Sequence, residues 1–174
     1  MGDTLITVIA IFLSAILMFV FPMMSLAERT DDMAQLSVQT VTTEFVNDVR
    51  TTGKLRIEDY EQFLQTITSF GYTYTVELEI KHLDENPGVK TTQAEMTKIG
   101  ENVYYTEYTT QILDKLNVTG YIVLKEGDMF STTVKNTNTT IAQMLRNFFY
   151  SIAGNENVQV AAKHGGIVSV NGSI

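Results

Sequence analysis

The first feature of the chain is an uninterrupted apolar run at residues 4–27, TLITVIAIFLSAILMFVFPMMSLA, which contains no charged side chain. A helix of this length extends about 36 Å at ~1.5 Å per residue, more than the ~30 Å hydrocarbon core of a membrane. The core helix of a soluble protein is rarely apolar on every face. We therefore expect residues 1–27 to form a membrane-anchoring helix that contacts lipid.

Two fates of this apolar segment remain open. A cleaved secretory signal is favoured by Ser25 and Ala27, which are small residues at the −3 and −1 positions of a candidate cleavage site. A retained anchor is favoured by the length of the run and by the Met-Gly-Asp start, which lacks the basic residues of a signal peptide. Of the two, we favour the retained anchor. N-myristoylation is disfavoured, because Ile6 stands where the motif has Ser or Thr.

An amphipathic pattern follows the apolar run and contains no glycine or proline at residues 28–52. Its apolar and small side chains recur at steps of three or four residues, the spacing of one helix face. We expect an amphipathic helical stalk here, continuous with the anchor, bent near Pro22 and ended by Gly53. The recurring positions are Ala34, Val38, Val41, Phe45 and Val49.

Residues 53–174 are expected to form a globular head. Residues 57–70, IEDYEQFLQTITSF, carry an apolar helix face and acidic side chains in the first turn, and predict a helix. Residues 73–83, TYTVELEIKHL, alternate apolar and polar side chains and predict a strand with one buried face. Residues 84–88, DENPG, predict a turn.

The remainder of the head carries less regular patterns, and residues 89–102 give no assignment. The predicted fold class is α+β: a long N-terminal transmembrane and amphipathic helix, then a head with a mostly antiparallel sheet of four or five strands and two to three helices. The further expected elements are a helix at 103–116, a hairpin of strands 120–125 and 129–135 with its turn at 126–128, a helix at 139–153, and a last hairpin of strands 158–163 and 167–170 around His164-Gly165-Gly166.

Composition removes several functional classes. The chain has 20 acidic and 12 basic side chains, so its net charge of −8 disfavours a nucleic-acid partner. It has no cysteine, which excludes disulfides, thiol nucleophiles and cysteine zinc sites. No phosphate-binding glycine loop, serine elbow or zinc-binding HExxH motif occurs. We therefore assign no catalytic residue, no metal and no cofactor.

Three groups of residues are candidates for catalysis or ligand binding. His82 and His164 are the only side chains with an ordinary pKa near neutrality. Glu77 and Glu79 share one strand face and, with Asp84 and Glu85, offer oxygen ligands to a cation, although a solvated acidic face is the preferred interpretation. The third group is a candidate sticky patch, for which packing in the sheet is preferred; its members are Tyr72, Tyr74, Tyr104, Tyr105, Tyr108 and Tyr121.

Two features bear on how the anchor is used. Ala10 and Ser14 are small residues four apart, a spacing that lets a second helix approach closely. Arg29 and Arg50 follow the apolar run, and the positive-inside rule by itself favours a cytoplasmic C-terminal part. The threonine-rich, cysteine-free head favours the opposite orientation, which we adopt: a single-pass protein of the cell membrane with an extracytoplasmic C-terminal domain.

The N-terminal plan resembles type IV pilins and pseudopilins. The resemblance rests on Gly2, the Asp-Thr-Leu-Ile-Thr opening that starts at Asp3, the apolar helix, Pro22 and the amphipathic continuation into an α+β head. Residues 39–46, 53–54 and 60–74 are similar to pilin-like proteins of Gram-positive Tad-type pilus and secretion clusters. Cleavage after Gly2 would make Asp3 the first residue and place Thr7 where pilins carry a glutamate.

This resemblance implies a non-enzymatic, membrane-anchored structural subunit of a bacterial pilus or secretion assembly. Its partners would be lipid and either copies of itself or other pilin-like subunits. One alternative is a monomeric surface-anchored binding or sensory domain that uses the helix as a tether. Another is an envelope enzyme that uses His82 or His164 with acidic partners. The residues expected to serve assembly and helix packing are Gly2, Asp3, Thr7, Ala10, Ser14 and Pro22.

Overall fold

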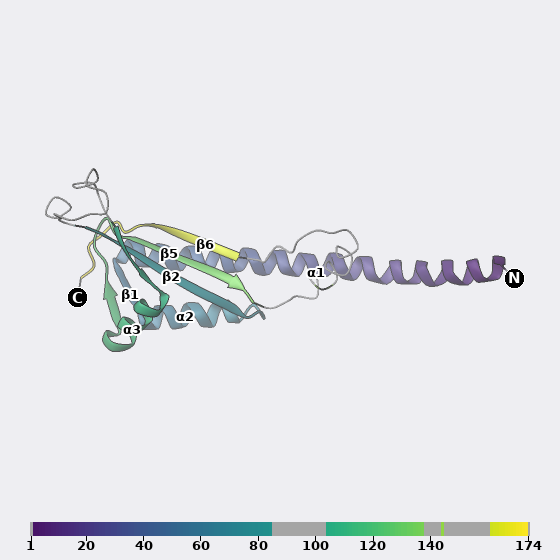
Figure 1. Ribbon diagram of the computed structural model, residues 1–174, viewed down its shortest axis with the longest axis horizontal. Coiled ribbons are helices and arrows are strands. Elements are labelled where there is room, and N and C mark those ends of the chain that lie inside the picture. Colours follow the sequence, from purple (N-terminus) through teal and green to yellow (C-terminus); the bar gives the residue numbers. More distant parts are fainter. Residues whose placement is uncertain (1, 85–103, 138–143, 145–160, 174) are drawn as a thin grey trace, which may run out of the picture. The chain divides into compact units, whose positions relative to one another are not determined.

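The computed structural model describes residues 2–84, 104–137, 144 and 161–173, and shows an α+β fold as expected (Figure 1). The chain divides into two compact units, Met1–Leu36 with Asn138–Gln159, and Ser37–Thr137 with Val160–Ile174. The helices are α1 (Gly2–Thr52), α2 (Ile57–Thr68) and α3 (Thr109–Thr119). The strands are β1 (Lys54–Arg56), β2 (Tyr74–Leu83), β3 (Tyr104–Tyr108), β4 (Tyr121–Val123), β5 (Met129–Asn136) and β6 (Ala161–Ile167).

Helix α1 is continuous from Gly2 to Thr52, which confirms the long helix expected from the two hydrophobic patterns. Pro22 lies inside it. The helix ends where Gly53 adopts a φ of 62°, the left-handed conformation that glycine accepts without steric cost. The Gly53 N–H donates to the Val49 carbonyl at 2.9 Å and so completes the last turn.

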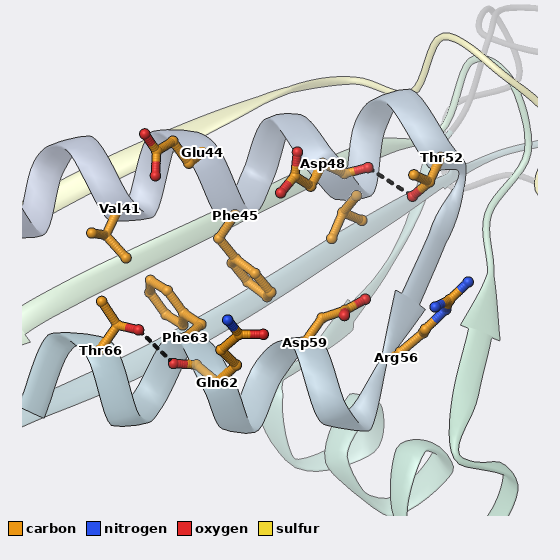
Figure 2. A pocket seen from close by; sticks show the side chains of 11 residues that line it. Val41, Glu44, Phe45, Asp48, Thr52, Arg56, Asp59, Gln62, Phe63 and Thr66 are labelled. Atoms are coloured by element: carbon orange, nitrogen blue, oxygen red, sulfur yellow. Dashed lines mark hydrogen bonds between the residues drawn. The ribbon is translucent and has the colours of Figure 1, made fainter.

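The second unit is built in two layers. The last turns of α1 and the whole of α2 pack on one face of a four-stranded antiparallel sheet of order β3-β2-β5-β6 (Figures 1 and 2). A smaller sheet pairs β1 with β4. The core is mostly aliphatic and aromatic, and it also buries polar side chains such as Thr132 and Asp128. Its fully buried large side chains include Val46, Val49, Leu55, Ile67, Leu78, Ile80, Ile112, Leu116, Leu124, Phe130 and Val134.

Strand β2 confirms the alternation of its sequence. Leu78 and Ile80 are buried, while Thr75 and Glu77 are exposed. The strand pairs with β5 along eight positions, from Tyr74 opposite Asn136 to Lys81 opposite Met129. Helix α2 likewise buries the face that its spacing predicted, through Tyr60, Phe63 and Ile67.

The helix expected at residues 103–116 is wrong in its first part, because Tyr104–Tyr108 form β3 and α3 begins at Thr109. The YYTEY stretch fits helical spacing, but aromatic side chains and Thr also favour a strand, and the edge of β2 offers its backbone as a partner. The Thr109 hydroxyl then fixes the start of α3, since it accepts from the Leu78 N–H at 2.8 Å and donates to the Leu78 carbonyl at 3.2 Å.

The hairpin expected around residues 126–128 is also wrong. A turn forms there, with the Asp128 N–H donating to the Lys125 carbonyl and Gly127 at a φ of 95°. The two strands that it joins belong to different sheets, because β4 pairs with β1 while β5 pairs with β2 and β6. Local pattern predicts the turn, but the identity of each strand's partner depends on distant segments.

The last expected hairpin is wrong for a different reason: His164-Gly165-Gly166 lies within β6 and makes no turn. A Cβ on Gly165 would lie 2.5 Å from the Ser131 Cβ, and one on Gly166 would lie 2.5 Å from the Arg50 guanidinium carbon. The two glycines therefore permit close packing of β6 rather than a reversal of the chain. Residues 85–88 of the expected turn, the helix at 139–153 (except Met144, which is helical) and residues 158–160 lie outside the described residues.

Candidate functional site

The first candidate site is the apolar part of α1. Its most hydrophobic window has none of its residues buried within the protein. Most of its large side chains are exposed, with Phe12 at 69% and Phe19 at 76%. By length and composition, α1 is one helix that is able to cross a membrane.

All six expected assembly residues lie on α1, and four of them share one face. Asp3, Thr7, Ala10 and Ser14 follow one another at steps of four, three and four, so they form a stripe along the helix. The Thr7 hydroxyl donates to the Asp3 carbonyl at 2.7 Å, which satisfies its polar group within the helix. Nothing lies within 4 Å of a Cβ built on Gly2.

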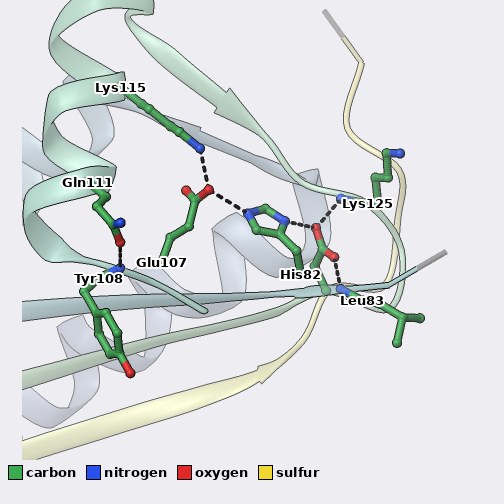
Figure 3. Close-up of polar contacts among 8 residues, drawn as sticks. His82, Leu83, Glu107, Tyr108, Gln111, Lys115 and Lys125 are labelled. Atoms are coloured by element: carbon green, nitrogen blue, oxygen red, sulfur yellow. Dashed lines mark hydrogen bonds and ion pairs between the residues drawn. The ribbon is translucent and has the colours of Figure 1, made fainter. Parts of the chain in front are cut away.

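The second candidate site surrounds His82 at the end of β2 (Figure 3). Asp128, whose side chain is only 4% exposed, accepts three hydrogen bonds there. One carboxylate oxygen, Oδ1, accepts from the Leu83 N–H at 2.9 Å. The other, Oδ2, accepts from the Lys125 N–H at 3.0 Å and lies 3.0 Å from His82 Nδ1. This carboxylate therefore holds the turn before β5 against the end of β2.

The opposite edge of the His82 ring faces a second carboxylate. Its Nε2 lies 3.9 Å from Glu107 Oε1, which also accepts from the Lys115 ammonium of α3. The ring stacks on Tyr105 at a centroid distance of 4.9 Å. Both imidazole nitrogens are thus directed at carboxylates, an arrangement that links β2, β3, α3 and the turn. A cavity of about 380 Å³ adjoins this cluster; its walls include Asp84, Val123 and Lys125.

The other charged candidates are separated from this cluster or engaged with lysines. Glu77 accepts from Lys135 at 2.8 Å, and Glu79 lies 3.4 Å from Lys81 and accepts from the Ser131 hydroxyl at 3.2 Å. His164 lies on β6 opposite Thr132, two strands away from β2. Glu85 is outside the described residues. Among the residues that are described, no three His, Asp or Glu side chains are grouped as metal ligands.

The six tyrosines of the candidate sticky patch do not form one surface in the structure. Tyr104, Tyr105 and Tyr108 of β3 are 38%, 57% and 61% exposed, so these three are largely outside the packing that we preferred for them. Tyr72 and Tyr74 are partly buried and pack edge to face at 6.3 Å, while the Tyr121 ring receives the Lys54 ammonium at 4.4 Å.

A third candidate, which the hydrophobic pattern did not predict, is a groove between α1 and α2 with a volume of about 400 Å³ (Figure 2). Phe45 and Phe63 stack between the helices at 4.4 Å and nearly parallel, and with Val41 and Val49 they make the floor. The charged lining consists of Glu44, Asp48, Arg56 and Asp59. The signal in the sequence was the pair Glu44 and Asp48, four residues apart beside the apolar stripe.

No family, no curated protein and no solved structure matches this chain.

Proposed function

We propose that this protein is a non-enzymatic, membrane-anchored, pilin-like structural subunit of a bacterial envelope pilus or secretion assembly. The observation that carries the proposal is α1 itself, a single helix whose run at residues 4–27 is uncharged and largely exposed, and whose last turns belong to the core of an α+β head. This combination gives a subunit two contact surfaces, a lipid-soluble helix and a water-soluble head. The N-terminal resemblance to pilins supports the same reading.

In this proposal the helix is stored in the membrane and then packs against sister helices. Lipid is as apolar as the helix surface, so close van der Waals contact is the main attraction between helices in that setting. Ala10 and Ser14 lie on one stripe, where small side chains let neighbouring backbones approach. Asp3 lies at the start of the same stripe and would pair with an amine of a neighbouring subunit in a region of low dielectric constant. The head faces outside and supplies further contacts between subunits.

The test is a double substitution in the stripe, Ala10→Leu with Ser14→Leu, expressed in the native envelope. Bulky side chains there hold the helices apart while leaving insertion unchanged, because leucine is as soluble in lipid as the residues around it. We expect the membrane level and the unfolding of the head to match the parent, and crosslinked oligomers to disappear.

The matched control is Ala15→Leu, because Ala15 is also exposed on α1 but lies about 140° around the helix from Ala10. It should retain crosslinking. If the double variant crosslinks as well as the parent, or if the parent crosslinks neither to itself nor to a pilus component, the helix is a tether. The surface-anchored binding domain would then replace the pilin-like subunit.

A further inference from the structure

The groove between α1 and α2 has an apolar floor and a charged rim. Phe45, Phe63 and Val49 of the floor are 6%, 4% and 2% exposed, and the two phenyl rings are stacked on each other. The rim carries Glu44, Asp48 and Asp59 against the single cation Arg56, and all four side chains are exposed. The groove therefore presents an excess of two negative charges beside an apolar strip.

The rim charges are not neutralised by ion pairs within the part of the second unit that the structure describes. Among the ion pairs of the described residues, none involves Glu44, Asp48, Arg56 or Asp59. The carboxylates that the fold uses elsewhere are paired, as Glu77 is with Lys135 and Glu107 with Lys115. Unpaired carboxylates at the edge of an apolar groove favour a cationic partner.

We propose that this groove binds an amphipathic, lysine- or arginine-bearing helix of a partner protein. A helix laid between two packed helices places apolar side chains at i, i+3, i+4 and i+7 into the groove and basic side chains on its margins. The volume of about 400 Å³ is near the small end of ligand pockets, roughly 300–1,000 Å³, and so admits a few anchor side chains rather than a large cofactor. The basic side chains of the partner helix would then lie next to Glu44 and Asp48 on α1 and Asp59 on α2.

Charge also argues against a second copy of this head as the occupant. Two copies that face each other through this groove would bring two negatively charged rims together, and like charges across an interface cost binding free energy. The chain as a whole has a net charge of −8, which adds to that repulsion. The groove lies wholly within the second unit, so its binding of a partner is independent of how the apolar part of α1 is used.

The experiment uses the full chain in nanodiscs of zwitterionic phosphatidylcholine, with empty nanodiscs subtracted. The probe is a fluorescent peptide of about 18 residues, patterned as an amphipathic helix with leucine on one face and lysine on its flanks. A peptide with the same residues in scrambled order is the control for charge alone. Binding is followed by fluorescence anisotropy at low and at high salt.

Two charge reversals test the site. Glu44→Lys with Asp48→Lys should weaken binding of the patterned peptide about tenfold or more at low salt. Asp114→Lys with Glu126→Lys makes the same change of net charge at exposed positions outside the groove, and should weaken binding less than about threefold. Glu44→Gln with Asp48→Asn should give an intermediate loss, and it serves as the test if the lysine pair unfolds the head.

Three outcomes would overturn the proposal. Equal losses in the groove and control variants would mean that the whole acidic protein attracts the peptide. Equal binding of the scrambled peptide would mean that the apolar floor plays no part. Oxidised dimers formed in the envelope through Gln62→Cys, in a chain that otherwise lacks cysteine, would assign the groove to a second copy.

Discussion

The strongest prediction on stability concerns Asp128, whose carboxylate is almost completely buried and accepts from two backbone N–H groups and from His82. Asp128→Ala removes the carboxylate that accepts from the Leu83 and Lys125 amides, and both hydrogen bonds are partly buried. A buried donor that loses its acceptor costs about 1–3 kcal/mol. Because these sites are only partly buried, we take about 1 kcal/mol for each of the three hydrogen bonds. The free energy of unfolding should therefore fall by about 3 kcal/mol.

A second substitution refines this estimate. Asp128→Asn keeps the shape of the side chain and one carbonyl oxygen, which can still accept from the Lys125 N–H and His82 if it occupies the Oδ2 position. The amide group at the other position then faces the Leu83 N–H, so that one hydrogen bond is lost. We expect a loss of about 1–2 kcal/mol, between the parent and Asp128→Ala.

The assay is urea unfolding of the full chain in detergent micelles, followed by the near-ultraviolet circular dichroism of its 8 tyrosines. The midpoint should move while the slope with urea stays constant, because the surface exposed on unfolding is unchanged. Asp114→Ala is the matched control, since Asp114 is exposed on α3. If Asp128→Ala loses no more free energy of unfolding than Asp114→Ala, the carboxylate contributes no net hydrogen bonding and the reasoning above is wrong.

Gly53→Ala should lower the free energy of unfolding of the head by about 3 kcal/mol or more, because the new Cβ would lie 2.5 Å from the Gly172 nitrogen. Gly120 has a similar φ but nothing within 4 Å of its Cβ position, so Gly120→Ala should cost only about 1 kcal/mol. Equal urea midpoints for the two variants would contradict this prediction. Burial raises the pKa of the Tyr60 hydroxyl above its ordinary 10.0, so the stability linked to its neutral form is complete below pH 10.0 and is lost as the pH rises further. Tyr60→Phe should therefore reduce the loss of unfolding free energy at alkaline pH. An unchanged loss in the variant would exclude this linkage. N-terminal sequencing of the membrane fraction should find the apolar helix still attached, and a start at Glu28 would show that it had been cleaved.

Local pattern was sufficient where one element's own spacing decides its structure. The uncharged run and the stripe from Ala34 to Val49 predicted α1, and the strict alternation after Thr73 predicted β2. Gly53 ended α1 as expected, because a left-handed residue is a local requirement. The apolar helix, the α+β class and the absence of cysteine chemistry all follow from the order and kind of residues alone.

The structure decided everything that depends on partners distant in sequence. YYTEY became β3 because the edge of β2 was available, and the strands on either side of Glu126-Gly127-Asp128 joined different sheets. The groove between α1 and α2 and the three hydrogen bonds of Asp128 bring together residues from separate elements. The local order of residues marks the pair Glu44 and Asp48 on α1, but it does not show that α2 lies opposite them. Hydrophobic spacing reports which face of an element is buried, but the free energy of strand pairing and side-chain packing depends on which neighbour covers that face. That neighbour is chosen only when the whole chain folds.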